Sequence, residues 1–202
     1  MPANTIDTGN YRIGGAALYF CSTVADGRLE VTHSGDLGVD ANSFGNIVTS
    51  EISPEYTQID HWVASKGRRV KDKSVLNTTA LSVNFTWDEM NQNNLAKFFV
   101  GTSSASKISV LQNTLDEGCA RLVIETDIGQ DMTYYIPKCV IRPDGALTTT
   151  VEDWHSAAMV LEVLEYIDGD NAGVAGDSTF IASWNTIWVA NPFGRVDTAH
   201  IS

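Results

Sequence analysis

Basic residues are scarce in this sequence of 202 residues. Lysine and arginine together number 13, against 25 aspartates and glutamates, and the formal net charge is −12. A protein that wraps nucleic acid gains affinity by releasing counterions with Lys and Arg. We therefore expect no direct DNA binding, although a surface that repels phosphates suits a protein that lies beside DNA without trapping it.

Long hydrophobic runs and a secretory start are also missing. No stretch approaches the roughly 20 apolar residues that cross a bilayer. The N-terminus, Met-Pro-Ala-Asn-Thr-Ile-Asp, lacks a basic start followed by an apolar stretch. We expect neither a signal peptide nor a membrane partner. With 43% hydrophobic and 19% charged residues, the composition is that of a globular protein with one sizeable core.

Cysteine and histidine are few and widely spaced. None has a second ligand at metal-binding spacing. The odd number of cysteines, in a chain expected to lack a signal, fits buried and inert reduced thiols in a cytoplasm. We therefore expect no metal and no cofactor. The residues are Cys21, Cys119, Cys139, His33, His61, His155 and His200.

Motifs for catalysis are absent too. Gly14-Gly15 lacks the further glycine and lysine of a phosphate-binding loop, and no Gly-x-Ser-x-Gly elbow occurs. The paired carboxylates lie where turns or a helix start are expected, which is the common place for solvated acidic caps. We expect that the protein is not an enzyme. The pairs are Asp88 with Glu89, Asp116 with Glu117, and Glu152 with Asp153.

Two segments show clean alternation of apolar and polar residues. From Ile47 to Val63 and again from Ser74 to Trp87, side chains alternate with period two, which predicts β-strands. Pro54 cannot donate to a strand ladder, so it marks a bulge, an edge position or a bend. Strands of well over ten residues exceed the usual 3 to 10, and each would span roughly 50 Å. Such a hairpin should leave its own domain and pair with strands of other subunits, since free edges invite aggregation.

The rest of the chain predicts more strands and one helix. Residues 88–101 have an Asp or Asn cap, an apolar face and a closing Gly101, which predicts the helix. Residues 168–202 change composition, and we expect either an extra hairpin on the body or an arm that docks on a neighbour. The predicted organisation is an all-β body over residues 1–167 with a C-terminal extension over 168–202. The further strands are 13–22, 107–112, 119–127, 132–142 and 156–167, with turns at 116–118, 128–131 and 143–145.

A basic cluster lies between the two long strands. Five of the 13 basic residues fall within eight positions. The cluster fits a solvated hairpin tip, or lysines that protect an edge strand from pairing. The cluster is only a weak indication of nucleic-acid binding, because no aromatic residues are interleaved with the basic ones. A positive tip on a long arm also fits contact with the acidic surface of an identical subunit. The residues are Lys66, Arg68, Arg69, Lys71 and Lys73.

Several runs in this order and spacing resemble the major tail tube proteins of long-tailed, non-contractile bacteriophages. The likeness covers roughly residues 12 to 167. The runs are Asn46–Glu55, Ser65–Lys73, Asn91–Gly101 and Ile136–Leu147, followed by Trp154.

The resemblance implies a β-sandwich or barrel-like subunit with one helix and a long hairpin. Six copies would form a hexameric ring with an inner β-barrel, and stacked rings would form the channel through which DNA leaves the virion. Strands 47–63, 74–87, 132–142 and 156–167 become candidates for the tube wall, and tip residues 66–73 for contacts within or between rings. Glu51, Glu55 and Thr57, which lie opposite the apolar parity, become candidates for the lumen side.

The resemblance also implies partners and a location. A tape measure protein and tail tip or terminator proteins would contact the tube, and genomic DNA would pass through it without specific binding. The protein would be assembled in the host cytoplasm and reside in the virion tail. The related tube protein of a contractile tail or secretion system is an alternative. From another class, a carbohydrate-binding β-sandwich would use Trp154, Trp184 and Trp188 as sugar platforms.

Overall fold

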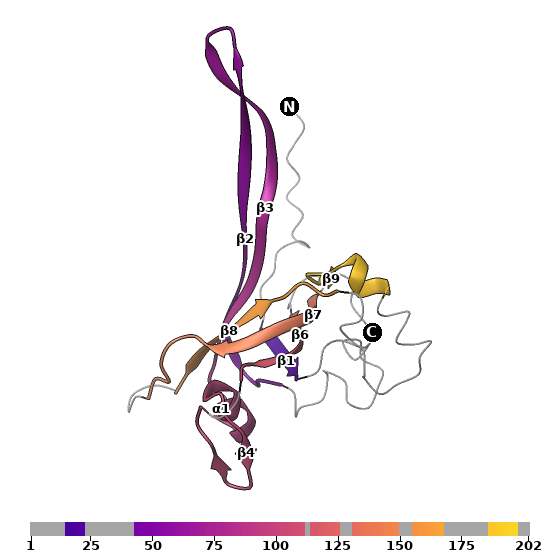
Figure 1. Ribbon diagram of the computed structural model, residues 1–202. Helices are drawn as coiled ribbons and strands as arrows, with labels where there is room; N and C mark the ends of the chain where they lie inside the picture. Colours follow the sequence, from indigo (N-terminus) through magenta and orange to yellow (C-terminus); the bar gives the residue numbers. More distant parts are fainter. Residues whose placement is uncertain are drawn as a thin grey trace, which may run out of the picture.

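The computed structural model describes residues 15–22, 43–111, 114–125, 131–149, 155–167 and 186–197. The fold is mainly β, as the sequence predicts, and every strand pair among the described residues is antiparallel. A curved sheet forms the body, and one hairpin projects far beyond it (Figure 1). The prediction for Trp154 and Trp184 falls outside the described residues.

One main sheet has the strand order β1-β6-β7-β8-β3-β2, and the short strand β9 also pairs with β7. A separate two-stranded sheet, β4-β5, lies beside the helix α1. The strands are β1 (Ala16–Cys21), β2 (Ile47–Ser65), β3 (Arg68–Trp87), β4 (Ser103–Ser104), β5 (Lys107–Ile108), β6 (Asp116–Ile124), β7 (Met132–Pro143), β8 (Ala157–Val163) and β9 (Arg195–Asp197), and α1 is Gln92–Phe98.

The main sheet curls until its first strand meets the segment that leads into β2. Ser43 forms a bridge with Tyr19, and the Phe44 N–H donates to the Leu18 carbonyl at 2.9 Å. These contacts satisfy backbone groups on the edge of β1 that would otherwise lack partners. The body is therefore a sheet that partly closes on itself.

The concave face of this sheet holds the main core, and we call it the core face. Leu18 on β1, Phe85 and Trp87 on β3, and Leu161 on β8 are almost fully buried there. Helix α1 packs against the same cluster through Phe98. Burial of this apolar surface, at about 25 cal/mol per Å², is the main force that holds the body together.

Helix α1 is fastened to the body by a buried asparagine. Asn94 is 2% exposed, and its side-chain amide donates to the Phe44 carbonyl at 3.0 Å and to the Glu89 carbonyl at 3.1 Å. The Asn91 side chain caps the helix by accepting from the Asn94 N–H at 2.9 Å. The helix thus begins later than the predicted Asp88, whose carboxylate instead accepts from the Asn46 side chain at 2.7 Å.

The opposite face of the sheet, which we call the outer face, carries a second cluster over β1, β6 and β7. Trp188, from a short helix at residues 186–190, is fully buried there with Tyr135 and Tyr166. Strand β9 continues this C-terminal segment and pairs with β7. Residues 186–197 therefore pack on the same body as strands β1, β6 and β7.

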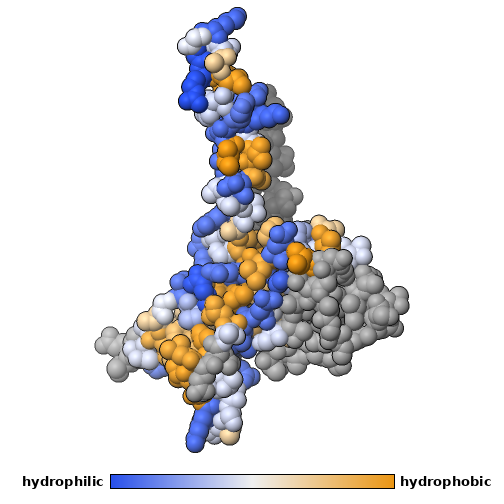
Figure 2. Space-filling model, viewed as in Figure 1, coloured by the Kyte–Doolittle hydropathy of each residue, from blue (hydrophilic) through white to orange (hydrophobic). Residues whose placement is uncertain are grey.

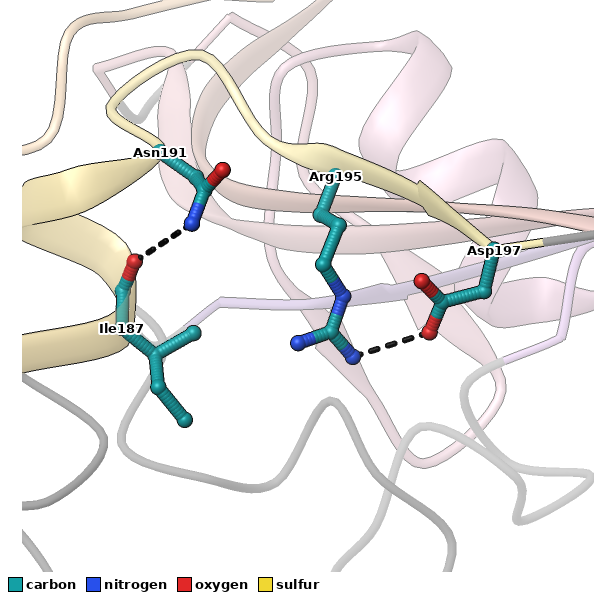
Figure 3. A network of polar contacts seen from close by, with 4 residues as sticks. All are labelled: Ile187, Asn191, Arg195 and Asp197. Carbon is teal, nitrogen blue, oxygen red and sulfur yellow. Dashed lines mark hydrogen bonds and ion pairs between the residues drawn. The ribbon is translucent and has the colours of Figure 1, made fainter.

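Cations and aromatic rings alternate across this second cluster. Tyr19, Arg121, Tyr135 and Arg195 stand directly opposite one another on β1, β6, β7 and β9. The guanidinium of Arg121 lies 4.8 Å from the Tyr19 ring, and that of Arg195 lies 5.5 Å from the Tyr135 ring. Arg195 also donates to Asp197 at 2.9 Å (Figure 3). Cation–π contacts of this kind each contribute about 0.5–2 kcal/mol when desolvated.

Two further predicted boundaries, both of strands, were wrong for identifiable reasons. The turn expected at residues 116–118 is part of β6, because Gly118 permits a close approach rather than a turn: a Cβ there would meet the Cys21 carbonyl oxygen at 1.9 Å. The strand expected over 107–112 is only Lys107–Ile108. Beyond it, Val110 and Leu111 are 53% and 78% exposed, so they find no sheet surface to pack against.

The proline inside β7 occupies a gap between partners. Pro137 falls where the β6–β7 register shifts, between the Gly118–Cys139 and Ala120–Ile136 pairs. On the other edge of β7, β9 pairs with residues 133–135 and β8 with residues 139–143. No strand in the described part of the chain pairs with Pro137 on either side, so its missing N–H costs no ladder hydrogen bond there.

We predict that Trp188→Ala lowers the free energy of unfolding by about 3–5 kcal/mol, because it empties a fully buried site. The neighbouring Val189 is 45% exposed, so Val189→Ala is the matched control and should cost less than about 0.5 kcal/mol. Urea denaturation followed by far-ultraviolet circular dichroism, which reports the backbone and not the removed indole, measures the free energy of unfolding of both variants. Equal, small losses in the two variants would contradict the packing of this segment.

Candidate assembly interface

The β2–β3 hairpin leaves the body where β3 loses its second neighbour. The pairing of β3 with β8 ends at the Leu81–Val163 pair. Beyond it, residues 56–65 of β2 and 68–80 of β3 pair with each other, and nearly all of them are exposed. At about 3.3 Å per residue, the ten residues 56–65 extend roughly 33 Å from the body. We call residues 56–80 the arm (Figure 1).

A two-residue turn closes the arm. Lys66 and Gly67 have φ angles of 49° and 79°, which fit a type I′ turn and its right-handed strand twist. The turn is therefore shorter than the predicted tip of residues 66–73, and four of the five predicted contact residues lie on β3. Register shifts occur near Thr57 and near His61, and β2 is an edge strand around Pro54. Of the alternatives for Pro54, the edge position is confirmed.

Apolar side chains are exposed on both faces of the arm. Opposed residues of an antiparallel pair point to the same face. By this register, Tyr56 and Leu76 extend the core face and are 68% and 61% exposed, whereas Ile59 and Val75 extend the outer face and are 61% and 63% exposed. Figure 2 shows these apolar patches between hydrophilic stretches along the arm. The remaining exposed apolar residues of the arm are Trp62, Val63 and Val70.

A polar cross-strand cluster holds the register in the middle of the arm. The Lys71 ammonium lies 2.7 Å from the Asp60 carboxylate, and the Ser74 hydroxyl donates to the same carboxylate at 2.6 Å. These hydrogen bonds lower the pKa of Asp60 below its ordinary value. His61 and Asp72 approach to 3.4 Å nearby. The cluster is exposed to solvent, so it fixes alignment more than it adds stability.

The five basic residues give the arm the charge opposite to that of the body. Together with Asp60 and Asp72 they give residues 56–80 a net charge of +3. Because the whole chain has a net charge of −12, the rest of the chain carries −15. Lys71 is engaged by Asp60, whereas in the described part of the chain no carboxylate pairs with the other four cations. Those four, Lys66, Arg68, Arg69 and Lys73, are exposed near the end of the arm.

The three residues predicted for a lumen lie together on the outer face. Glu51, Glu55 and Thr57 occupy alternate positions of β2, on the face opposite the main core. The Thr57 hydroxyl is hydrogen-bonded to that of Thr78 across the hairpin. Beside Glu55, an open depression of about 510 Å³ reaches the Arg142–Glu162 pair, whose Nε–Oε1 distance is 2.6 Å. This half of the outer face is thus polar and uncovered by the described residues.

An apolar groove at the root of the arm escaped the sequence reasoning. It has a volume of about 450 Å³ and lies on the core face. Phe193, from the C-terminal segment, closes one side of it. The alternation along β2 predicts that Tyr56 lies on the apolar face of the strand. No signal in the sequence links it to Phe193, which is distant along the chain. The lining residues are Pro54, Glu55, Tyr56, Leu76, Thr79, Ala80, Leu81 and Phe193.

Features of other function classes are lacking among the described residues. No cluster of three or more His, Cys, Asp or Glu side chains that could hold a metal occurs there. No helix in the described ranges is long and apolar enough to cross a membrane. Trp188 is fully buried, so its ring is not presented as a sugar platform.

We predict that the body folds without the arm. Thr57 and Thr78 stand opposite each other, as do Ser65 and Arg68 around the turn. Deleting residues 58–65 and 68–77 therefore joins Thr57 and Thr78 through the native Lys66-Gly67 turn. Because the removed residues pack mainly on each other, the melting temperature should change by less than about 4 °C. A fall of more than about 10 °C in differential scanning calorimetry would show that the arm stabilises its own body.

The comparisons with known proteins add one finding. Residues 31–120, which include the whole β2–β3 hairpin and α1, match the model of a family described as protein of unknown function UCP028589. No curated protein matches the chain.

Proposed function

We propose that this protein is the major tail tube subunit of a long-tailed, non-contractile bacteriophage, and that it self-assembles into stacked hexameric rings. The observation that carries the proposal is the arm: a two-stranded ribbon, roughly 33 Å beyond its body, with apolar side chains exposed on both faces. An isolated two-stranded hairpin is at best marginally stable in water. An arm of this kind requires partners along its edges and on its faces.

Free edges favour identical copies as those partners. Among the described residues, β2 ends the sheet order along its whole length, and β3 has no second neighbour from Arg68 to Ala80. Both edges of the arm thus carry unpaired backbone groups, which template pairing with another strand. Copies arranged in a ring, with their arms side by side, satisfy both edges at once, because each arm supplies one edge to each neighbour.

The position of the four candidate wall strands supports the tube. Strands β7, β8, β3 and β2, which contain the predicted wall segments, are consecutive in the sheet. Six copies that each contribute four strands, spaced about 4.8 Å apart, make a wall roughly 115 Å around and about 37 Å across. Such a channel admits a DNA duplex, and Glu51 and Glu55 on the polar outer face would repel its phosphates.

Charge supports attraction between copies. The arm at +3 and the remainder of the chain at −15 attract each other when they belong to different subunits. Complementary charge of this kind raises association rates and suppresses wrong pairings. The four unpaired cations near the end of the arm then contact the acidic body of a neighbour in the same or the next ring.

The proposal brings further partners with it. A tape measure protein occupies the channel before DNA does, and tail tip and terminator proteins close the two ends. DNA passes without specific binding, which agrees with the acidic composition. Assembly takes place in the host cytoplasm, and the mature protein resides in the virion tail.

We predict that wild-type protein forms rings and tubes roughly 10 nm wide, the width of the pore with two sheet layers and their side chains around it. Negative-stain microscopy and sedimentation velocity measure this across a concentration series. Wild-type protein that stays monomeric at millimolar concentration, even when nucleating tail components are added, would overturn the proposed function.

We further predict that replacing both Arg68 and Arg69 with Glu raises the critical concentration for tube formation at least about tenfold. The two reversals change the net charge at the end of the arm by four units, from attraction to repulsion of an acidic neighbour. Lys107→Glu, an exposed reversal on β5 away from the arm, is the matched control and should assemble normally. The shortened-arm variant should remain monomeric. Normal assembly of the double Glu variant would remove the role of the arm cations while leaving the tube proposal intact.

A further inference from the structure

Two cysteines stand directly opposite each other on neighbouring strands. Cys21 ends β1, Cys119 lies in β6, and the antiparallel register pairs them. Their side chains therefore share the outer face, and both belong to the cluster around Tyr135 and Trp188. The sequence predicted three inert thiols, since nothing in the spacing of positions 21 and 119 indicates that they meet.

We propose that Cys21 and Cys119 form a reversible cross-strand disulfide when the folded protein meets a small-molecule disulfide oxidant such as oxidised glutathione. Directly opposed antiparallel residues have Cα atoms about 4.5–5.5 Å apart. Disulfides join Cα atoms about 4.4–6.8 Å apart. A pair in this register therefore falls within the range of spacings that the bond requires.

The strands approach closely at this pair. A Cβ on Gly118, the residue before Cys119, would meet the Cys21 carbonyl oxygen at 1.9 Å. A side chain at that position would push the end of β1 away from β6. Gly118 therefore keeps Cys21 against the strand that carries Cys119.

The exposure of the two cysteines determines which thiol reacts first. Cys21 is half-buried, whereas Cys119 is 1% exposed. The Cys21 thiolate attacks the oxidant, forming a mixed disulfide and releasing one thiolate. The Cys119 thiol then loses its proton to solvent, its sulfur attacks the Cys21 sulfur, and a second thiolate leaves. The protein loses two protons and two electrons, and one molecule of oxidised glutathione becomes two of the reduced form.

A cation lies near the more exposed thiol. Lys97, at the end of α1, interacts electrostatically with Cys21 and with Asp116, and both interactions oppose the lowering of the Lys97 pKa by burial. A positive charge near a thiol favours the thiolate, which is the reactive species. The attack is therefore assigned to Cys21.

The third cysteine is a natural control. Cys139 is fully buried in the core cluster, on the other face of the sheet from Cys119. Burial raises the pKa of its thiol far above the ordinary value. Cys139 should therefore take no part in the exchange, and Cys139→Ala should leave the bridge intact.

The bridge would fix the strand that closes the body. β1 contacts the segment before β2 through Leu18 and Tyr19, and a bond to β6 would hold it in that place. Because residues 21 and 119 are far apart in sequence, the bond closes a long loop of the unfolded chain, the case in which a disulfide stabilises most.

The test uses purified full-length protein treated with oxidised glutathione, and it does not depend on tube formation. We expect the thiol count under denaturing conditions to fall from three to one, the mass to fall by about 2 Da, and digestion to give a peptide linked through Cys21 and Cys119. The melting temperature should rise by about 5 °C or more and return with dithiothreitol.

Variants separate the bridge from other oxidation products. Cys139→Ala should show the full shift, and Cys21→Ser and Cys119→Ser should show none. A glutathione adduct that persists on Cys21 of the otherwise unaltered chain would overturn the proposal. So would a disulfide between two chains, a bond to Cys139, or three thiols retained after treatment.

Discussion

The pairing of β3 with β8 stops at Leu81, and the rest of the structure follows from that end point. Below it, β3 is a central strand with a buried face, and its side chains build the core. Above it, the same strand has one partner, both faces exposed and a free edge. Backbone N–H and C=O groups are satisfied by water there, at the cost of leaving a template for another strand. One continuous strand thus belongs both to a stable body and to an exposed two-stranded ribbon.

The body is held by two clusters on opposite faces of one sheet. The core face is closed by α1, which Asn94 fastens to the segment before β2. The outer face is closed over β1, β6 and β7 by residues 186–197, with Trp188 buried and Arg195 stacked near Tyr135. The part of the outer face over β8, β3 and β2 is left polar. The residues left uncovered on this face are the ones that would line the channel of the tube that we propose.

Local sequence patterns predicted most strands, because period-two alternation reports a sheet with one buried face. They placed the long hairpin, but not the length of its turn: Arg68 to Lys73 looked like a loop because charge obscures the alternation of an exposed ribbon. Gly118 predicts a turn because the sequence does not distinguish a glycine that permits a close approach of two strands from a glycine that adopts a positive φ. The groove at Phe193 and the Cys21–Cys119 pair depend on which strands become neighbours, and that order is set by packing across distant parts of the chain.

The two strands of the β2–β3 hairpin differ in charge. Between Ile47 and Ser65, β2 carries Glu51, Glu55 and Asp60 and no Lys or Arg, whereas four of the five basic residues lie on β3. When copies stand side by side with their arms pointing the same way, the acidic strand of one faces the basic strand of the next. A mirror-like pairing of β3 with β3 would bring like charges together. In the ring that we propose, this contact would be directional, with two different surfaces meeting, and a directional contact repeats around a circle where a self-complementary one would stop at a pair.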